Sequence, residues 1–351
     1  MFLTTKNEKE CYGCFSCQNF CPVNAIFTVQ DSQGYFYPSI DEKICIHCKT
    51  CERVCPNTLP HEAFALPKDC FAGLIKDKAD LKKSSSGGAF KAIVQACRKH
   101  FALNYDAFYC AGVRFTDDFR VVHDVIKITD DNSIDLFSKS KYVQCYPAGI
   151  FKRCNSIIAD ERNFLVFSGS PCHCAAARKA FGDKKNVLLI DVICHGAPAQ
   201  SVFDEYKKTL EKQYGSELVF YEFRTKNKLE NGTYYTRSVT YRFADGTERR
   251  LSRLDDSYLK DFYDEKYIPR PSCTNCQFKR AERISDITIG DAWRINELYE
   301  NLYPQGGVSS VILTSEKAVA LQQSIQNEMD VYAVHYDFLV AHNEPLKGSQ
   351  Q

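Results

Sequence analysis

The spacing of apolar residues along the chain predicts a mixture of helices and strands. Apolar residues recur at helical spacing from the end of the serine-glycine run at residues 84–88 to about His100, which predicts a helix there. Two strands are predicted next, at residues 107–115 and 121–129, and the polar turn between them makes the pair antiparallel. This part of the chain therefore begins a mixed α/β domain.

The middle of the chain alternates strand and helix. Apolar runs at residues 163–168 and 187–194 predict strands, and residues 174–181 and 200–214 predict helices, so that the four form a βαβα unit. The last helix is expected to bury one side, made of Val202, Phe203, Tyr206 and Leu210. The loops after the two strands carry cysteine and turn residues, at the edge where open α/β sheets hold ligands.

Further elements complete this larger domain. A hairpin is predicted at residues 233–243 and 247–254, because Asp245-Gly246 separates two runs of strand character. The remaining predicted elements are two strands and a helix, at residues 286–290, 310–314 and 316–327.

Composition limits the possible classes of function. The chain has 351 residues, of which 44% are hydrophobic and 25% charged, which suits one small and one large domain. Its net charge of +1, with both signs mixed, gives no footprint for nucleic acid. No apolar run approaches the roughly 20 residues of a membrane span, and residues 1–10 lack the apolar core of a signal peptide. A cytoplasmic protein of a reducing cell is expected.

The spacing of cysteines is the strongest chemical signal. Eight of the 18 cysteines stand in two copies of Cys-x2-Cys-x2-Cys-x3-Cys-Pro, the pattern of a two-cluster bacterial ferredoxin. In that arrangement the fourth cysteine of each copy binds the cluster of the other copy. The predicted ligand sets are Cys11, Cys14, Cys17 and Cys55, and Cys45, Cys48, Cys51 and Cys21. Zinc knuckles and the disulfides of small secreted domains do not account for two matching patterns of this length.

Four more cysteines lie where loops would converge, namely Cys172, Cys194, Cys273 and Cys276. One thiolate from each strand-end loop and two from a Cys-x2-Cys pair would give the four ligands of a third iron–sulfur cluster. Zinc would accept the same four cysteines, and His173, Cys174 or His195 would be able to replace one of them. A site without metal is the third alternative. The other cysteines, such as Cys97, are expected to be small apolar core residues.

Two loops carry groups that suit a nucleotide cofactor. Hydroxyls and unhindered N–H groups at a helix N-terminus suit a pyrophosphate, and this run offers Ser84, Ser85, Ser86, Gly87 and Gly88. An ordinary serine cap with glycines for a tight turn is the simpler explanation. A second segment, Ser140, Lys141 and Tyr142, combines a cation with a ring that would clamp a phosphate or stack on a flat cofactor. The single tryptophan, Trp293, follows an apolar strand, where it either stacks on a cofactor or packs.

Six segments, taken in order, resemble the beta subunit family of coenzyme F420-reducing hydrogenases and dehydrogenases. They are residues 84–90, 140–144, 167–172, 191–196, 271–276 and 285–291. The resemblance implies an α+β ferredoxin-like 2[4Fe-4S] unit at residues 1–60, followed by a larger α/β flavin-binding domain at residues 68–345. It implies FAD near the serine-glycine loop and the Lys141-Tyr142 segment, and it favours a third [4Fe-4S] cluster over zinc.

The chain departs from the pattern of this family at several positions. Cys145 stands where serine is usual, His173 where glutamine is usual, and Ser170 replaces threonine. Lys139 stands where glycine is frequent, and residues 292–294 read Ala-Trp-Arg instead of Phe-Trp-Gly. The last two departures lie where an F420-like ring or a substrate would approach, so the identity of the partner is left open.

The resemblance implies an enzyme that moves electrons. Members of the family pass hydride to or from F420, or use ferredoxin electrons to reduce an organic substrate, and bacterial relatives commonly lie beside polysaccharide biosynthesis genes. The expected partners are a ferredoxin or another low-potential carrier and a small substrate, with His195 or Lys141 supplying a proton or stabilising charge. The alternative is an electron-transfer subunit of a larger redox complex with no substrate of its own. The substrate, the donor, the direction of flow and the oligomeric state are left open.

Overall fold

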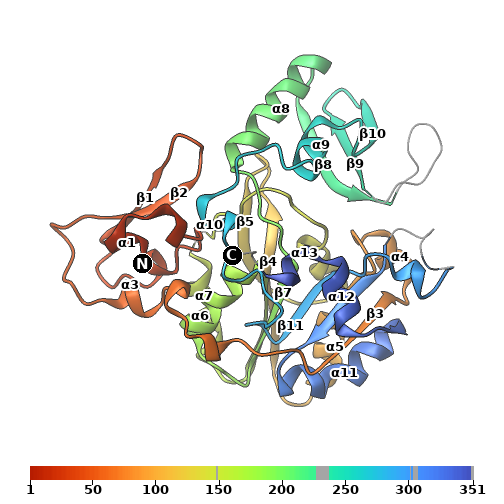
Figure 1. Ribbon diagram of the computed structural model, residues 1–351, viewed down its shortest axis with the longest axis horizontal. Helices are drawn as coiled ribbons and strands as arrows, with labels where there is room; N and C mark the ends of the chain where they lie inside the picture. The colour runs from red at the N-terminus through yellow and green to blue at the C-terminus, as the bar shows by residue number, and fades with distance from the viewer. Residues whose placement is uncertain (148, 227–236, 301, 303–306, 349–351) are drawn as a thin grey trace.

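The computed structural model describes residues 1–147, 149–226, 237–300, 302 and 307–348. It has three parts (Figure 1). They are a small N-terminal unit on the left, a large central sheet with helices, and, at the top of the view, a small sheet together with helix α8. The N-terminal unit and the central sheet correspond to the ferredoxin-like unit and the larger α/β domain that the sequence predicts.

The N-terminal unit contains one antiparallel hairpin, β1 (Ile26–Gln30) and β2 (Phe36–Ile40). Its helical segments are α1 (Phe2–Thr5), η1 (Glu8–Glu10), α2 (Ser16–Asn19), α3 (Thr50–Arg53), η2 (Pro56–Thr58) and η3 (His61–Ala63). The two cysteine copies fold alike, because Gly13 and His47 occupy matching positions with φ of 68° and 52°, and Phe15 and Lys49 do so with 53° and 58°. These left-handed residues turn the backbone of each copy around its cysteines.

The central sheet has the strand order β13-β3-β12-β11-β7-β6-β4-β5. Its strands are β3 (Asp69–Ile75), β4 (Ala107–Phe115), β5 (Val121–Lys127), β6 (Asn163–Gly169), β7 (Val187–Val192), β11 (Ile287–Asp291), β12 (Ser309–Leu313) and β13 (Met329–Ala333). Strands β4, β6, β7 and β11 are parallel, and β3 points the same way because it is antiparallel to β12, which is antiparallel to β11. The carboxyl ends of these five strands therefore meet at one edge.

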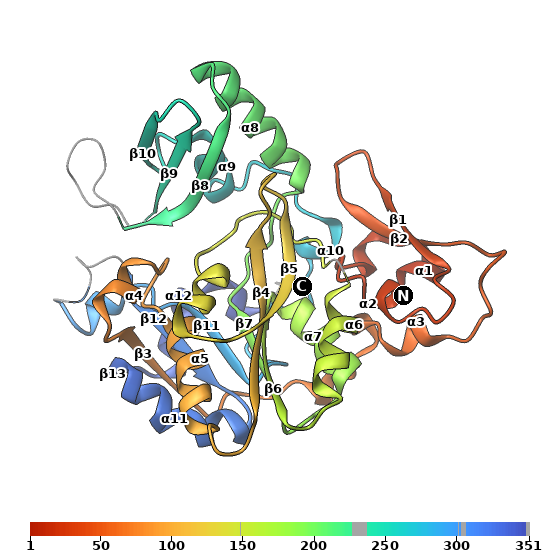
Figure 2. The ribbon, with the colours of Figure 1, turned by 180° about the vertical axis from the view of Figure 1, so that it is seen from behind.

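Helices cover both faces of this sheet (Figure 2). The helical segments of this domain are α4 (Lys78–Lys82), α5 (Ala89–His100), η4 (Asp131–Phe137), α6 (Ile150–Ile158), α7 (Pro171–Phe181), α10 (Pro271–Thr274), η5 (Ile295–Glu297), α11 (Glu316–Glu328), α12 (Tyr336–His342) and α13 (Glu344–Lys347). Strand β6 shows the layering, since Phe164 and Val166 belong to the core with α5 and α11, whereas Leu165 and Phe167 pack with α6 and α7. Side chains alternate between faces along a strand, so α5 and α6 lie on opposite faces.

The small sheet has the order β10-β9-β8 and packs against two helices. Its elements are α8 (Gln200–Tyr214), β8 (Leu218–Thr225), β9 (Ser238–Phe243), β10 (Glu248–Ser252) and α9 (Ser257–Tyr263). Aromatic rings fill its core, among them Phe203, Phe223 and Tyr258, whose ring centroids lie 5.4–5.7 Å apart. Strands β9 and β10 form the predicted hairpin, although residues 233–236 of that prediction lie outside the described residues.

Most predicted elements are confirmed within a few residues, and the exceptions have simple causes. Val202, predicted on the buried side of its helix, is 38% exposed, because it lies about 100° around the helix from the fully buried Phe203. The segment between the two predicted domains packs against the large domain: Phe64 is buried beside Phe278, and Ala65 pairs with Arg283 in an isolated antiparallel bridge. Cys97 is a core thiol, as predicted. No helix among the described residues is both long and apolar enough to span a lipid bilayer.

Candidate functional site

The thiols of Cys11, Cys14, Cys17 and Cys55 line one cavity in the N-terminal unit. Burial is the main cause that raises the pKa of Cys14 and of Cys17, and the thiols of the same set raise both further. The backbone N–H groups of Ser16 and Asn57 face the sulfurs of Cys14 and Cys55 and act to lower the pKa of these thiols. Cys11 and Cys14 are buried, and Cys17 and Cys55 are partly buried. Four clustered sulfurs with N–H groups beside them are a donor set that fits a [4Fe-4S] cluster.

The second set of N-terminal cysteines is more open to solvent. Cys48 is exposed, and its hydrogen bonding with Thr50 lowers the pKa of its thiol. Cys48 acts electrostatically on Cys51 of the same copy. The sulfur of Cys45 accepts from the His47 N–H at 3.4 Å, and that of Cys21 from the Ala25 N–H at 3.2 Å. Within this set, the described residues show an electrostatic effect between thiols only for Cys48 and Cys51. Cys21 and Cys45 are assigned to the set because the sequence pattern of the first copy is repeated.

The third set is assembled from three separate segments. Cys172 lies in the first turn of α7 after β6, Cys194 follows β7, and Cys273 and Cys276 belong to α10 and the turn after it. Each of these thiols acts electrostatically on others of the set, with Cys172 in reach of all three partners. Burial raises the pKa of Cys273 to about 12 and that of Cys276 to about 11. The tertiary structure therefore brings together four thiols that the sequence separates by about a hundred positions.

Two of the three alternative ligands considered for this set, Cys174 and His173, have other neighbours. The Cys174 thiol donates to the carbonyl of Ile190 at 3.4 Å inside the core. The ring of His173 lies beside that of His123, with 5.7 Å between their centroids. His195 is exposed, and partial burial together with the charge of Lys279 lowers its pKa. The four sulfurs form a complete set without Cys174 or His173, which fits an iron–sulfur cluster and also satisfies the ligand preference of zinc.

Arg270 joins the third set to the first. Its guanidinium is 1% exposed and donates to the carbonyls of Cys11, at 3.0 Å, and Phe36. It also lies over the rings of Tyr35 and Tyr37, at 5.2 and 4.3 Å from their centroids. A Cβ on Gly13 would meet this guanidinium at 2.9 Å, so glycine is required there for close approach as well as for its φ of 68°. The N-terminal unit is therefore fixed to the large domain beside two of its cysteines.

Tyr12 lies between the same two sets. It follows Cys11 in sequence, and the thiols of Cys172, Cys273 and Cys276 act electrostatically on its hydroxyl. Its ring packs edge-on against Phe278 at 4.8 Å between centroids. A cysteine of the first set and three of the third set are thus separated by a single aromatic residue.

The two candidate cofactor loops meet at the carboxyl edge of the sheet. The Ser140 N–H donates to the Ser85 hydroxyl at 2.9 Å, which joins the serine-glycine run to the Ser140-Lys141-Tyr142 segment. The Ser84 hydroxyl donates to the carbonyl of Asp80 at 2.7 Å, and no side chain caps α5 after Gly88. A Cβ on Gly87 would lie 2.2 Å from the carbonyl oxygen of Gly73, so this glycine lets the loop pass against the sheet.

Cations gather around these loops. Lys226 donates to the carbonyls of Leu81, at 2.8 Å, and Ser86, and burial lowers its pKa to about 7. Arg224 forms two hydrogen bonds with Asp291, at 2.7 and 3.0 Å. Burial alone would raise the pKa of Asp291, but the Arg224 charge holds it below its usual value. Basic side chains beside helical N–H groups provide hydrogen-bond donors that fit the phosphates of a nucleotide.

The two candidate catalytic residues lie in different surroundings. Burial lowers the pKa of Lys141 to about 7, and its amine donates to the carbonyls of Ser138, at 2.6 Å, and Lys139, at 3.1 Å. His195 lies next to Cys194 and within the electrostatic reach of Lys279. No contact joins Lys141 to His195 among the residues that the structure describes.

Two regions of the chain match known protein families. Residues 10–58 match the model of a 4Fe-4S dicluster domain, and residues 163–337 match the model of the C-terminal region of the coenzyme F420 hydrogenase/dehydrogenase beta subunit. The chain belongs to the coenzyme F420 hydrogenase/dehydrogenase beta subunit family. It is therefore an iron–sulfur protein related to the subunits of redox enzymes.

A solved structure shows the same fold as this family member. The F420-reducing [NiFe] hydrogenase complex from Methanosarcina barkeri, in a xenon-derivatised form, contains a chain that matches 82% of this one at 15% identity. The match covers 93% of that chain and has a TM-score of 0.52. No curated protein sequence matches the chain.

Several residues of the site in this family member lie outside the sequence predictions. Arg270 and Ser272 stand beside Cys273 in the sequence, but no pattern indicates that they reach Cys11. Arg224 carried no clear signal, because its strand β8 also contains the polar residues Glu222 and Thr225. Lys226 and His123 carried no signal, because their partners come from distant segments.

Proposed function

We propose that this chain is an iron–sulfur flavoprotein oxidoreductase that passes electrons between a ferredoxin-like or F420-like carrier and a small organic substrate. The family and the dicluster domain support an oxidoreductase role with [4Fe-4S] clusters. When bound, such clusters exchange single electrons, and FAD couples single electrons to the transfer of a hydride. The third cluster at Cys172, Cys194, Cys273 and Cys276, the FAD and the substrate belong to the proposal. A link to polysaccharide biosynthesis rests on the resemblance of the sequence alone.

The observation that carries the proposal is the junction at Tyr12. Arg270 and Ser272 hold the carbonyl of Cys11, and Tyr12 packs against the third set of cysteines. Buried aromatic packing keeps the first and third sets close and excludes water between them. Cys48, by contrast, is exposed, so the second set is the one that an external carrier would approach.

The chain's own residues provide for a flavin at the carboxyl edge of the sheet. Ser140 and Ser85 hold the two loops together, and Lys226 places a cation against the serine-glycine run. Lys141, with a pKa of about 7, is able to hold or release a proton near neutral pH. These features support FAD binding with its phosphates near α5.

Anaerobic reconstitution with iron, sulfide and FAD tests this function. We expect about twelve iron and twelve sulfide per chain, as for three [4Fe-4S] clusters, together with one non-covalent FAD. A screen of reduced ferredoxin and reduced F420 as donors should then reduce the flavin. A reconstituted chain with its full iron content but no bound flavin would overturn the proposal.

An electron-transfer subunit without a substrate is the second candidate. Ile44 and Ile46 flank Cys45 in the second set and are 47% and 60% exposed, an apolar surface that suits a protein partner. Likeness in fold to a chain of a hydrogenase complex supports the same role. A stable partner that co-purifies with the chain, and no turnover of small molecules without it, would favour this candidate.

A further inference from the structure

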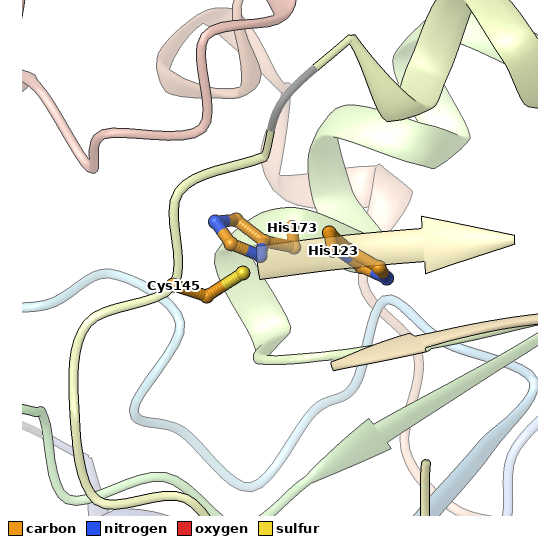
Figure 3. A group of neighbouring side chains, drawn as sticks. All are labelled: His123, Cys145 and His173. Atoms are coloured by element: carbon orange, nitrogen blue, oxygen red, sulfur yellow. The ribbon is translucent and has the colours of Figure 1, made fainter. Parts of the chain in front are cut away.

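His123, Cys145 and His173 form a cluster that the function above does not use. One imidazole nitrogen of each histidine and the sulfur of Cys145 all lie within 4.8 Å of one another. His123 comes from β5, His173 from α7, and Cys145 from the segment after Lys141, and Figure 3 shows the Cys145 sulfur directed toward His173. Three segments that are distant in sequence thus place two imidazoles and one thiol together.

The two histidines of this cluster lack hydrogen-bond partners. His123 is 0% exposed and His173 is 5% exposed. Neither ring nitrogen of His123, nor Nδ1 of His173, has a partner of ordinary geometry in the described part of the chain. The Ser168 backbone lies beside the His123 ring without making such a bond. A buried polar group without a partner costs about 1–3 kcal/mol, so these nitrogens call for a ligand.

The packing around the cluster keeps it in place. A Cβ on Gly169 would meet the Cβ of His173 at 3.1 Å and Cε1 of His123 at 3.2 Å, so the glycine makes room for both rings. The His123 ring also packs on Phe167, with 4.7 Å between centroids. The nearby cation Arg153 is paired with Asp124 at 2.7 Å. The rings are therefore held by apolar contacts that leave their nitrogens for another partner.

The cluster is distinct from the third cysteine set, although Cys172 and His173 are neighbours in sequence. Successive residues of a helix point about 100° apart, and Cys172 faces Cys194, Cys273 and Cys276 while His173 faces His123.

We propose that His123, Cys145 and His173 bind a zinc ion whose fourth ligand is water or a substrate atom. Neutral imidazole and thiolate are ligands that zinc prefers, and three protein ligands are typical of sites with an exchangeable fourth position. In a tetrahedral zinc site such atoms lie roughly 3.4–3.7 Å apart. The three ligand atoms here lie within 4.8 Å of one another, so rotation of the side chains would draw them around the ion. The Cys145 thiol loses its proton to the solvent when the ion binds.

Metal analysis of anaerobically purified, reconstituted protein tests this site. We expect one zinc per chain in addition to the iron, and loss of that zinc in Cys145→Ser and in His173→Gln, with iron content unchanged. Serine is close in size to cysteine and glutamine to histidine, so both variants are expected to fold. Cys154→Ser, at another buried thiol in α6, is the matched control and should keep the zinc.

Two further measurements separate the outcomes. Substitution of zinc by cobalt should give the near-ultraviolet absorption of a thiolate–cobalt bond, which disappears in Cys145→Ser and persists in Cys154→Ser. Zinc that survives in Cys145→Ser and is lost in Cys194→Ala would belong to the third cysteine set and overturn the proposal. Equal zinc content in the wild type and in both ligand variants, or no zinc in folded wild type supplied with the ion, would overturn it as well.

Discussion

The Ser272 hydroxyl donates a hydrogen bond of 2.8 Å to the backbone carbonyl of Cys11. Ser272 directly precedes Cys273 of the third set, and Cys11 is the first cysteine of the N-terminal unit. The two residues are separated by most of the chain, yet a hydrogen bond and one peptide link connect the two cysteine sets. The same carbonyl accepts from Arg270 at 3.0 Å, so it is doubly held. This junction decides how the small unit sits on the large one.

Arg270→Met should destabilise the protein at this junction. The change leaves the carbonyl of Phe36 without its donor and removes one of two donors from that of Cys11, which costs about 2–3 kcal/mol. The midpoint of urea-induced unfolding under anaerobic conditions measures this cost. Arg162→Met, at an arginine that is 74% exposed, is the control and should change stability by less than about 0.5 kcal/mol. Equal midpoints for both variants would contradict the role of Arg270.

Iron content should distinguish the cysteine sets. Cys14→Ser and Cys194→Ala should each lower the iron by about four atoms per chain, because each removes one ligand from a separate cluster. Cys14→Ser should leave the flavin bound, since that thiol lies in the N-terminal unit. Cys97→Ser, at a thiol buried in the core, should keep the full count. Unchanged iron in Cys194→Ala would mean that the third set holds no cluster.

Replacement of Lys226 should weaken flavin binding. Lys226→Gln removes the cation that contacts the Ser86 carbonyl, and the affinity for FAD should fall by about tenfold or more, since a phosphate contact of this kind contributes about 1.5–3 kcal/mol. Flavin absorbance after gel filtration measures retention. Lys83→Gln, on an exposed lysine paired with Asp135, should retain FAD like the wild type. Full retention in Lys226→Gln would place the phosphates elsewhere.

Lys141 should make stability depend on pH. Its pKa is about 7 in the folded protein, because burial disfavours the charged amine, and near 10.4 in the unfolded chain. Between these values the unfolded chain binds more protons, so this group makes stability rise with pH, by up to about 1.4 kcal/mol per pH unit. Lys141→Met should therefore lose part of the pH slope that the wild type shows between about pH 7 and 9.

Parallel urea titrations across this pH range would measure the difference in slope. Lys152→Met, at an exposed lysine of α6, is the control and should keep the wild-type slope. Identical slopes for the wild type and Lys141→Met would show that the amine stays protonated in the folded protein, and would remove it as a proton donor near neutral pH.

In Cys194→Ala, a one-electron donor and a hydride donor should differ in their ability to reduce the flavin. If the third set lies on the path to the flavin, a low-potential one-electron donor should no longer reduce FAD in this variant, while a small hydride donor still bleaches it. Stopped-flow absorbance of the flavin measures both rates. Unchanged rates with both donors, in a variant shown to lack the cluster, would take the third set off the path.

Local patterns in the sequence were enough for the elements and for the first cysteine sets. The eight N-terminal cysteines are recognisable in the sequence because a short loop sets the spacing of cluster ligands. Helix α5 and strand β4 are predicted from the periodic pattern of apolar residues. The sequence also predicted that Cys172 and Cys194 lie close together, since both follow parallel strands whose carboxyl ends meet at one edge of the sheet.

Only the tertiary structure decided which distant groups touch. Ser272 reaches Cys11, Ser140 reaches Ser85, and His123 meets Cys145 because sheets and helices pack in one particular arrangement. Such contacts leave no periodic trace in a single sequence, since neither partner needs a special neighbour along the chain. The sequence therefore determined the chemistry of the iron–sulfur unit, whereas packing determined how that unit docks, where the cations gather and which histidines are left without partners.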